Sequence, residues 1–243
     1  LNSMDGSLVQ LDVKLISVQR LEVGLTYLSN KDIFFHVDAT QSFGKLVPEL
    51  KALKYDMLSM SAHKIGGPQG VGALVLRKKR YKLPPVKGIM YGGQQEHGIR
   101  PGTIPVALVA GLGKACALSA AEYEQSQKKC LAIRLAIMDL LKNSGVDYEI
   151  NGDEKFMFSS TVNLYFPGVS SEALMLSTKQ YCGVSNGSAC NSSSYKPSYV
   201  LSAMGLSAER ISNSIRVSWG KDTDLLDAVD EFKKLLSVVK SFQ

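Results

Sequence analysis

The sequence has few cysteines, no paired cysteine motif and no apolar run as long as a membrane span. Four cysteines occur among 243 residues, and no CxxC pair offers metal-ligand spacing, so we expect neither a disulfide framework nor a metal site. No apolar run approaches the ~20 residues that cross a bilayer, and the first residues lack the basic and apolar segments of a signal peptide. These absences predict a cytoplasmic protein with free thiols and no membrane association.

A nucleotide-binding P-loop is also absent. The stretch SAHKIGGPQG at 61–70 places a lysine before the glycines, whereas a P-loop needs the lysine after them and a hydroxyl residue next. Lys64 is therefore either a solvated loop residue or an amine held near a strand end, where it could form a Schiff base with a carbonyl compound.

The composition is that of a globular protein. With 45% hydrophobic residues and a mean hydropathy of +0.00, the chain can bury one large core or two smaller ones. The net charge of +6 includes one dense basic run, RKKRYK at 77–82, which follows an apolar segment and precedes two prolines. We interpret this run as a solvated turn and expect no direct nucleic-acid binding.

The first half of the chain has the pattern of an α/β domain. Three apolar runs, at 32–39, 55–62 and 70–77, have the length and composition of buried strands. A short helical stretch near Pro48 separates the first two, which gives a strand–helix–strand unit. Polar residues collect where these strands end, which is the edge at which open α/β sheets bind ligands.

The second half has a different pattern. Helical spacing from Pro105 to about Asn143 predicts one long helix that leaves a first domain and enters a second. Short elements of both kinds follow, which is typical of an α+β domain: strands within 160–166 and 214–220, and helices at about 171–181 and 222–240. We therefore predict an α/β domain over residues 1–122 and a smaller α+β domain over residues 123–243.

Two predicted strand ends carry residues that suit an aldehyde cofactor with a pyridine ring and a phosphate. Lys64 would form the imine, and Asp38 would keep the pyridine nitrogen protonated so that the ring acts as an electron sink. Gln41 would donate to the phenolate oxygen of the ring, and Ser61 and His63 would bind the phosphate. Taken singly, each residue has an ordinary explanation, such as a helix cap, a hydrogen-bonded histidine or a solvated lysine. Their combination favours the cofactor.

Cys190 lies in a polar loop, VSNGSACNSSSYKPS, that is rich in serine and glycine. We predict that its thiol is exposed and mobile. Cys116 and Cys130 fall in an apolar helical pattern and are predicted to be core residues. A cysteine protease would be an alternative use of the loop, but none of the available bases has an obvious orienting partner: His36, His63 and His97.

Five short segments stand out in chain order: HVDATQSFGK, SMSAHKIGGPQGVGALVLR, GGQQEHGIRPGTIP, SNGSAC and SNSIRVSWG. Together they resemble the cysteine desulfurases, pyridoxal-phosphate enzymes of the class V aminotransferase group. The resemblance covers nearly everything from Asp32 to the end. It implies a large domain of the aspartate-aminotransferase type (fold type I), incomplete here, and a small C-terminal domain with the cysteine loop.

The resemblance also implies roles for single residues of the first domain. Lys64 resembles the Schiff-base lysine that moves the substrate protons. Asp38 and Gln41 resemble the residues that bind the ring nitrogen and the phenolate oxygen. Ser61 and His63 resemble the phosphate ligands of the same subunit.

Three further roles follow from the same resemblance. Thr103 in RPGTIP resembles the threonine that reaches the phosphate of the other subunit, which implies a homodimer. Arg216 in SIRVS resembles the arginine that holds the substrate carboxylate. Cys190 resembles the nucleophile that takes sulfur from L-cysteine as a persulfide, releases L-alanine and passes the sulfur to an acceptor protein.

Two alternative functions stay open. A class V aminotransferase or a selenocysteine lyase would keep Lys64, Asp38 and Arg216 but would not need Cys190. A non-catalytic, sulfur-accepting or scaffold protein of the same fold would neither release alanine nor form a persulfide from L-cysteine. The segment before Asp38 is too short to hold the amino-terminal phosphate loop of a desulfurase, so we expect the amino-terminal part to be missing. The GIRPGTIP stretch and the short tail resemble the desulfurases that supply sulfur to DNA phosphorothioation or to other dedicated acceptors.

Overall fold

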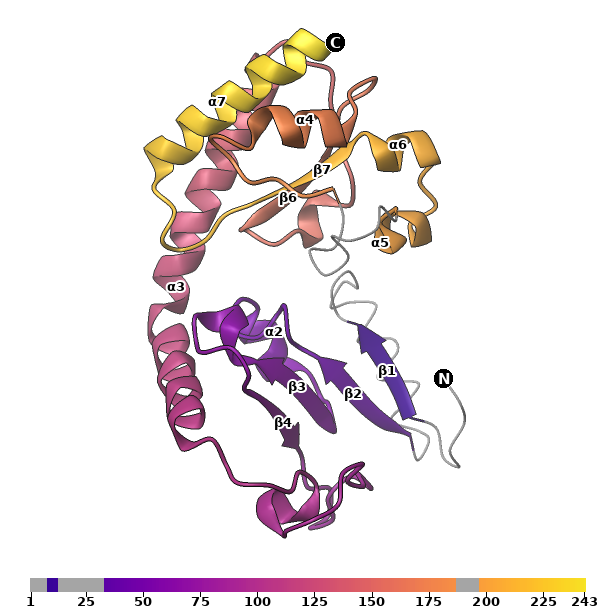
Figure 1. Cartoon of the computed structure of the whole chain (residues 1–243), viewed down its shortest axis with the longest axis vertical. Coiled ribbons are helices and arrows are strands. Elements are labelled where there is room, and N and C mark those ends of the chain that lie inside the picture. The colour runs from indigo at the N-terminus through magenta and orange to yellow at the C-terminus, as the bar shows by residue number, and fades with distance from the viewer. Residues whose placement is uncertain (1–7, 13–32, 187–196) are drawn as a thin grey trace. The chain divides into compact units, whose positions relative to one another are not determined.

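The computed structural model describes residues 8–12, 33–186 and 197–243 (Figure 1). The chain forms two compact units, Leu1–Tyr123 and Glu124–Gln243. The division falls one residue away from the boundary that the sequence indicates between residues 122 and 123.

The first unit contains a four-stranded sheet with the order β1 (Leu8–Asp12), β2 (Phe34–Asp38), β3 (Met57–Ser61) and β4 (Gly72–Leu76). The first three strands are parallel and β4 is antiparallel to β3. All three apolar runs form strands, as predicted, but β4 is mostly exposed rather than buried, and β1 was not predicted.

The reversal between β3 and β4 follows from a short connection. Only a 3₁₀ turn, η1 (Ala62–Ile65), and a glycine-rich turn separate the strands, and a parallel return would need a crossover of a dozen or more residues. Gly66 and Gly70 adopt φ angles of 80° and 86°, which side chains with a Cβ rarely tolerate. The glycines after Lys64 therefore allow the chain to turn back.

The core of the first unit lies between the sheet and two helices, α2 (Val47–Ala52) and α3 (Val106–Asn143). Alternate residues of β2 are buried, which places Phe35 and Val37 in this core together with Leu112 of α3. The predicted helix at Pro48 is confirmed, because proline occupies the first turn of α2, where its missing N–H costs nothing.

The basic run at 77–82 forms an exposed turn, as predicted. Lys79 and Lys82 exchange backbone hydrogen bonds of 2.8 and 3.1 Å, and the two residues between them, Arg80 and Tyr81, have positive φ angles of 50° and 67°. Arg77 lies over the ring of Tyr55, with 4.0 Å from its guanidinium carbon to the ring centroid. Part of the basic charge therefore has a local structural partner.

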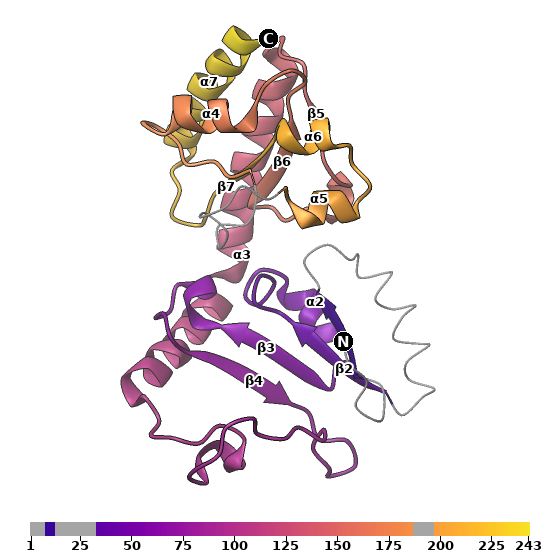
Figure 2. The ribbon, with the colours of Figure 1, turned by 45° about the vertical axis from the view of Figure 1, so that its right-hand side comes forward.

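The second unit is α+β, as predicted (Figure 2). Its antiparallel sheet has the order β5 (Glu149–Ile150), β6 (Thr161–Tyr165) and β7 (Ser214–Ser218). Besides the C-terminal part of α3, the described residues of this unit form the helices α4 (Ser171–Thr178), α5 (Tyr199–Ala203), α6 (Ala208–Ser212) and α7 (Leu225–Phe242). Short 3₁₀ turns complete the two units, η2 (Gln95–Gly98) in the first and η3 (Glu154–Phe156) in the second.

One face of this second sheet is apolar and packs on helices. Val162 and Leu164 of β6 are buried with Ile215 of β7, against Ile133 of α3 and Leu235 of α7. The residues that alternate with them on the strands are polar or aromatic and less buried, apart from Ser214. The core side of the sheet is therefore separate from a polar side.

Helix α3 corrects one expectation. Within the described residues it is the one helix long and apolar enough to cross a membrane, judged by length and composition alone. The expected lack of such a stretch was wrong because Ala, Val and Leu outweigh its few charged residues over a long window. This is weak evidence for a membrane span, since α3 also supplies Leu112 and Ala115 to one core and Ile133 and Ile137 to the other.

Candidate active site

The ends of β2 and β3 lie side by side at one edge of the first sheet. Asp38, the last residue of β2, pairs in register with Ser59 of β3, and the Ala39 N–H donates to the Ser59 carbonyl oxygen over 2.9 Å. Ser61 ends β3 two residues later. The structure thus places Asp38 and Ser61 at the same edge, where open α/β sheets bind ligands.

Asp38 begins a tight turn. Its carboxylate oxygen Oδ1 accepts a hydrogen bond of 2.9 Å from the backbone N–H of Thr40, and the N–H groups of Ser42 and Phe43 donate to the Ala39 carbonyl oxygen. The half-buried Gln41 lies in this turn. The local bond explains how the carboxylate is held at the strand end, and it is the capping role that a strand-end aspartate often has.

Ser61, His63 and Lys64 follow one another on and after the end of β3. The Ser61 hydroxyl and His63 Nδ1 are 2.8 Å apart and hydrogen-bonded. Lys64 lies on η1 and is half-buried, whereas His63 is exposed. A Cβ at Gly67 would lie 3.0 Å from the Ala115 Cβ, so the backbone after Lys64 passes close to α3.

Thr103 lies in an exposed loop before α3, and its side chain has no hydrogen bond among the described residues. The loop is held in shape by a 3.1 Å bond from the Gly102 N–H to Gln95 Oε1. Glu96 and His97 have φ angles of 50° and 58°, a conformation that costs energy for residues with a Cβ.

Arg216 lies on β7 in the second unit, on the polar side of the sheet, and its side chain is exposed. Within the residues that the structure describes, its guanidinium has no hydrogen bond or ion pair. Arg210, six residues earlier, differs, because it forms an ion pair with Glu149 and donates from Nε to Asn151 Oδ1 over 2.7 Å. Of these two arginines of the second unit, Arg216 is therefore the one with donors to offer a ligand.

The sequence did not indicate the hydrogen-bond network around Arg210. It joins β5, β6, β7 and α6 through Asn151, which donates to Asn163 Oδ1 over 2.7 Å and to Ser214 Oγ over 2.8 Å. Asn151 and Ser214 are 6% and 1% exposed, and buried polar groups of this kind are normally satisfied. The polar residues alternating with apolar ones in TVNLY were the available signal.

Cys190 lies outside the described residues. The segment that leads to it is anchored beside Arg216, because Ser185 and Arg216 exchange backbone hydrogen bonds of 2.6 and 3.1 Å. Ser185 is five residues before Cys190 in the sequence. The pairing therefore places Ser185 beside Arg216, whose side chain has no partner among the described residues.

The other three cysteines form no disulfide within the part of the chain that the structure describes. Cys130 is 5% exposed, as predicted for a core residue. Burial raises the pKa of the half-buried Cys116 thiol. Burial also raises the pKa of the Cys182 thiol, an effect opposed by a hydrogen bond with Thr178. A raised pKa lowers the thiolate fraction, so neither residue has the environment of an activated nucleophile.

The histidines do not support a cysteine protease. His36 Nε2 is buried without a hydrogen-bond partner, His63 bonds Ser61, and His97 is exposed on η2. Across the described segments none of the three bonds a carboxylate that would orient it as a base, and such an orienting group is part of a catalytic triad.

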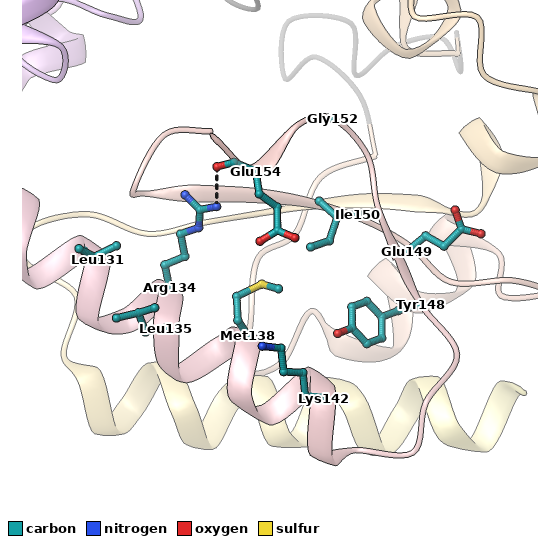
Figure 3. Close-up of a pocket in the computed structure, with 10 residues that line it drawn as sticks. All are labelled: Leu131, Arg134, Leu135, Met138, Lys142, Tyr148, Glu149, Ile150, Gly152 and Glu154. Atoms are coloured by element: carbon teal, nitrogen blue, oxygen red, sulfur yellow. Dashed lines mark hydrogen bonds between the residues drawn. The ribbon is translucent and has the colours of Figure 1, made fainter. Parts of the chain in front are cut away.

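A cavity of about 650 Å³ lies elsewhere, between α3 and the segment 148–154 of the second unit (Figure 3). Leu131, Leu135 and Met138 of α3 line one side. Arg134 bonds across the cavity to the Glu154 carbonyl oxygen over 3.1 Å. The cavity contains none of the predicted site residues, so it is not the candidate active site.

Comparison with known proteins identifies the family. A family model described as aminotransferase class-V matches residues 17–228. Cysteine desulfurase IscS of Photobacterium profundum is 43% identical over 190 residues, which are 78% of this chain and 46% of that protein. The cysteine desulfurase of Homo sapiens is 36% identical over 225 residues, 88% of this chain and 49% of that protein. The chain spans about half the length of the curated relatives it matches.

Solved structures agree with the fold. A NifS-like protein matches with a TM-score of 0.82 and 27% identity, over 99% of this chain and 63% of that one. DndA of Streptomyces lividans matches with a TM-score of 0.72 and 34% identity, over 89% and 61% of the two chains. A structure of SspA in complex with cysteine matches with a TM-score of 0.61 and 30% identity, over 87% and 58%. The expected fold type I architecture, with part of the large domain, is confirmed, and the chain belongs to the class V aminotransferase family.

Proposed function

We propose that this chain carries catalytic residues of a pyridoxal-phosphate-dependent cysteine desulfurase, which converts L-cysteine to L-alanine and takes the sulfur on Cys190 as a persulfide. One observation carries the proposal: Asp38, the bonded pair of Ser61 and His63, and Lys64 occupy adjacent strand ends at one edge of the sheet. The desulfurase names of the relatives support it.

The residues at this edge fit pyridoxal phosphate by their chemistry. Ser61 and His63 form a hydrogen-bonded pair on one turn and would donate to the phosphate. Asp38 would hold the ring nitrogen, Gln41 would donate to the phenolate oxygen, and Lys64 would bind the aldehyde carbon. When bound, pyridoxal phosphate supplies an electron sink that stabilises negative charge at the substrate α-carbon.

The side chain of Lys64 has two tasks in this proposal. Its amine binds the cofactor between turnovers, and once released it moves a proton from the substrate α-carbon. Half-burial on η1 limits the water around the amine, and Gly66 and Gly67 let the backbone turn away directly after it. The Asp38 carboxylate, held by the Thr40 N–H, keeps its negative charge in place at the strand end.

Arg216 would bind the substrate carboxylate. A guanidinium presents two parallel donors to a carboxylate, which a lysine ammonium cannot do. The lack of a described partner for Arg216 supports this role, because the neighbouring Arg210 is already neutralised by Glu149.

Cys190 would complete the reaction. Its thiolate would attack the substrate sulfur and form the S–S bond of a persulfide, while the substrate Cβ–S bond breaks and its electron pair stays with Cβ. Protonation of Cβ would then complete the methyl group of L-alanine, which leaves. The anchor between Ser185 and Arg216 supports a cysteine that starts beside the substrate carboxylate. Its serine- and glycine-rich segment suits delivery of the sulfur to an acceptor protein.

Homodimer formation and a cytoplasmic location are part of the proposal. Thr103 would reach the phosphate in the other subunit, and its exposed loop supports this. Ile89 and Tyr91, 92% and 94% exposed, are large apolar side chains of the kind that a partner surface covers. Light scattering after size exclusion tests this, since a monomeric mass would refute the shared site. The DNA phosphorothioation role stays a prediction.

The function is tested by two measurements on the same sample. The protein is loaded with pyridoxal phosphate, reduced with borohydride and digested, and mass spectrometry should find the cofactor on Lys64. The loaded protein should release alanine from L-cysteine and carry a persulfide. A Lys64→Ala variant should lose both, and Lys82→Ala, in the exposed basic turn, serves as the matched control.

The same experiment separates the alternatives. A class V aminotransferase or selenocysteine lyase would carry the cofactor on Lys64 but would leave no persulfide on the protein. A non-catalytic relative would release no alanine. Cofactor found on another lysine would refute the assignment of Lys64.

A further inference from the structure

The side chains of Asn163 and Arg216 lie opposite each other on neighbouring strands. The two residues are register partners in the antiparallel pair of β6 and β7. On the side of β7 that faces away from β6, the backbone N–H and carbonyl oxygen of Arg216 bond Ser185. On the side of β6 that faces away from β7, the Asn163 carbonyl oxygen accepts from the Asn151 N–H. The two residues therefore form a non-hydrogen-bonded pair, the kind in which opposite side chains are closest, with Cα atoms about 4.5 Å apart.

Both side chains lie on the polar side of the sheet. Successive residues of a strand point to opposite faces, and Val162, Leu164 and Ile215 occupy the core side. The neighbouring register pair, Thr161 and Ser218, confirms the polar character, since their hydroxyl oxygens are 3.0 Å apart.

The orientation of the Asn163 amide is fixed by a chain of donors. Arg210 can only donate, so its 2.7 Å bond requires the oxygen of Asn151 at that position. The Asn151 nitrogen then faces Asn163 and donates to its Oδ1 over 2.7 Å. The Asn163 Nδ2 group, with two N–H donors, is consequently the end of the amide turned away from Asn151.

The N–H donors of Asn163 Nδ2 and of the Arg216 guanidinium are available for a ligand within the described structure. The described residues offer no hydrogen-bond acceptor to Asn163 Nδ2 and no carboxylate to the Arg216 guanidinium. Glu149 is the acidic residue nearest in the network, and it is paired with Arg210. An amide and a guanidinium thus present donors side by side, with the local negative charge held elsewhere, which suits an anion with two oxygens.

We propose that Asn163 Nδ2 donates a hydrogen bond to the same carboxylate that Arg216 binds, and that Arg210 and Asn151 are positioning residues that fix the orientation of the amide. The inference rests on the proposed function for the identity of the carboxylate, which is the α-carboxylate of L-cysteine. It adds a substrate-binding residue on β6 to the arginine on β7.

Steady-state kinetics with L-cysteine provide the first test. Loss of one hydrogen bond to a charged group should raise KM about 10- to 100-fold, with little change in kcat because the contact is present in substrate and transition state alike. Asn163→Asp keeps the oxygen that accepts from Asn151 and removes the donors, so it separates this role from a structural one. Asn163→Ala should raise KM similarly.

The matched control is Ser218→Ala, a neighbour on β7 on the same side of the sheet, which should keep the wild-type KM. A wild-type KM in Asn163→Asp would overturn the inference. Equal loss in the control would also overturn it, because the effect would then belong to the sheet surface as a whole.

A binding measurement separates this inference from the proposed function. Sodium acetate is titrated into the ¹⁵N-labelled protein, and the side-chain amide signal of Asn163 should shift while that of Asn151 stays in place. If no alanine is released from L-cysteine but the Asn163 signal shifts, the carboxylate site stands and the desulfurase proposal falls. If acetate leaves the Asn163 signal unchanged, the inference is overturned whatever the activity.

Discussion

A single methyl group at Gly72 should disturb both the first sheet and the candidate site. A Cβ at this position would lie 2.5 Å from the Met60 carbonyl oxygen, whereas ordinary contact begins at 3.4 Å, so backbone atoms would have to separate by about 0.9 Å. Overpacking of this kind costs about 1–3 kcal/mol. Gly72 is also the register partner of Ser61, so the shift acts on the strand end that precedes Lys64.

The assay is urea unfolding followed by circular dichroism, combined with borohydride labelling of Lys64. Gly72→Ala should lower the free energy of unfolding by about 1–2 kcal/mol, because the smaller flexibility of alanine in the unfolded chain offsets part of the clash. Gly113→Ala is the control: no atom lies within 4 Å of its Cβ, and alanine in the helix should stabilise the protein by about 0.5–1 kcal/mol. Gly72→Ala with wild-type stability would refute the reasoning.

Three further outcomes test the site. Cys190→Ser should keep the cofactor on Lys64 and lose the persulfide, measured by thiol labelling after incubation with L-cysteine; a persulfide on another cysteine would contradict the assignment. Arg216→Lys should raise the KM for L-cysteine about 10-fold or more while cofactor retention is unchanged, and equal loss of both would contradict it. Because burial raises the pKa of Cys116 and Cys182, less thiolate is present at neutral pH, so their alkylation by iodoacetamide should be slow at pH 7 and should keep accelerating to a higher pH than that of an unperturbed cysteine; peptide mass spectrometry across a pH series would show a pH-independent rate if this is wrong.

The sequence predicted elements with a strong local signal. The apolar runs ending at Asp38 and Ser61 and the helical spacing after Pro105 correspond to β2, β3 and α3, because buried parallel strands appear as short apolar runs and helices repeat their apolar residues with a period of 3.6. Strand β5, Glu149–Ile150, has two residues, too few to show any period. The antiparallel direction of β4 depends on the short turn after Lys64, which the apolar pattern does not encode.

The sequence predicts those candidate-site residues that lie at or just after the end of a strand. Asp38, Ser61 and Lys64 stand at positions that the order of strands brings to one edge. The sequence did not indicate Asn163, since the role proposed for it depends on the register that sets it opposite Arg216, 53 residues later in the chain. A shift of one residue in that register would turn the side chain to the other face.

The two arginines near the end of the chain show what the structure adds to residue type. Arg210 and Arg216 are chemically identical and six residues apart, so composition and charge cannot rank them as carboxylate ligands. Arg210 is compensated by Glu149, bonds Asn151 and lies 5.0 Å from the ring centroid of Tyr165. A guanidinium with those partners stabilises the fold and would lose them on binding a ligand. Arg216, fixed by backbone bonds on β7 and without a described side-chain partner, would break no protein contact on binding a carboxylate, and this difference in partners supports the role proposed for it.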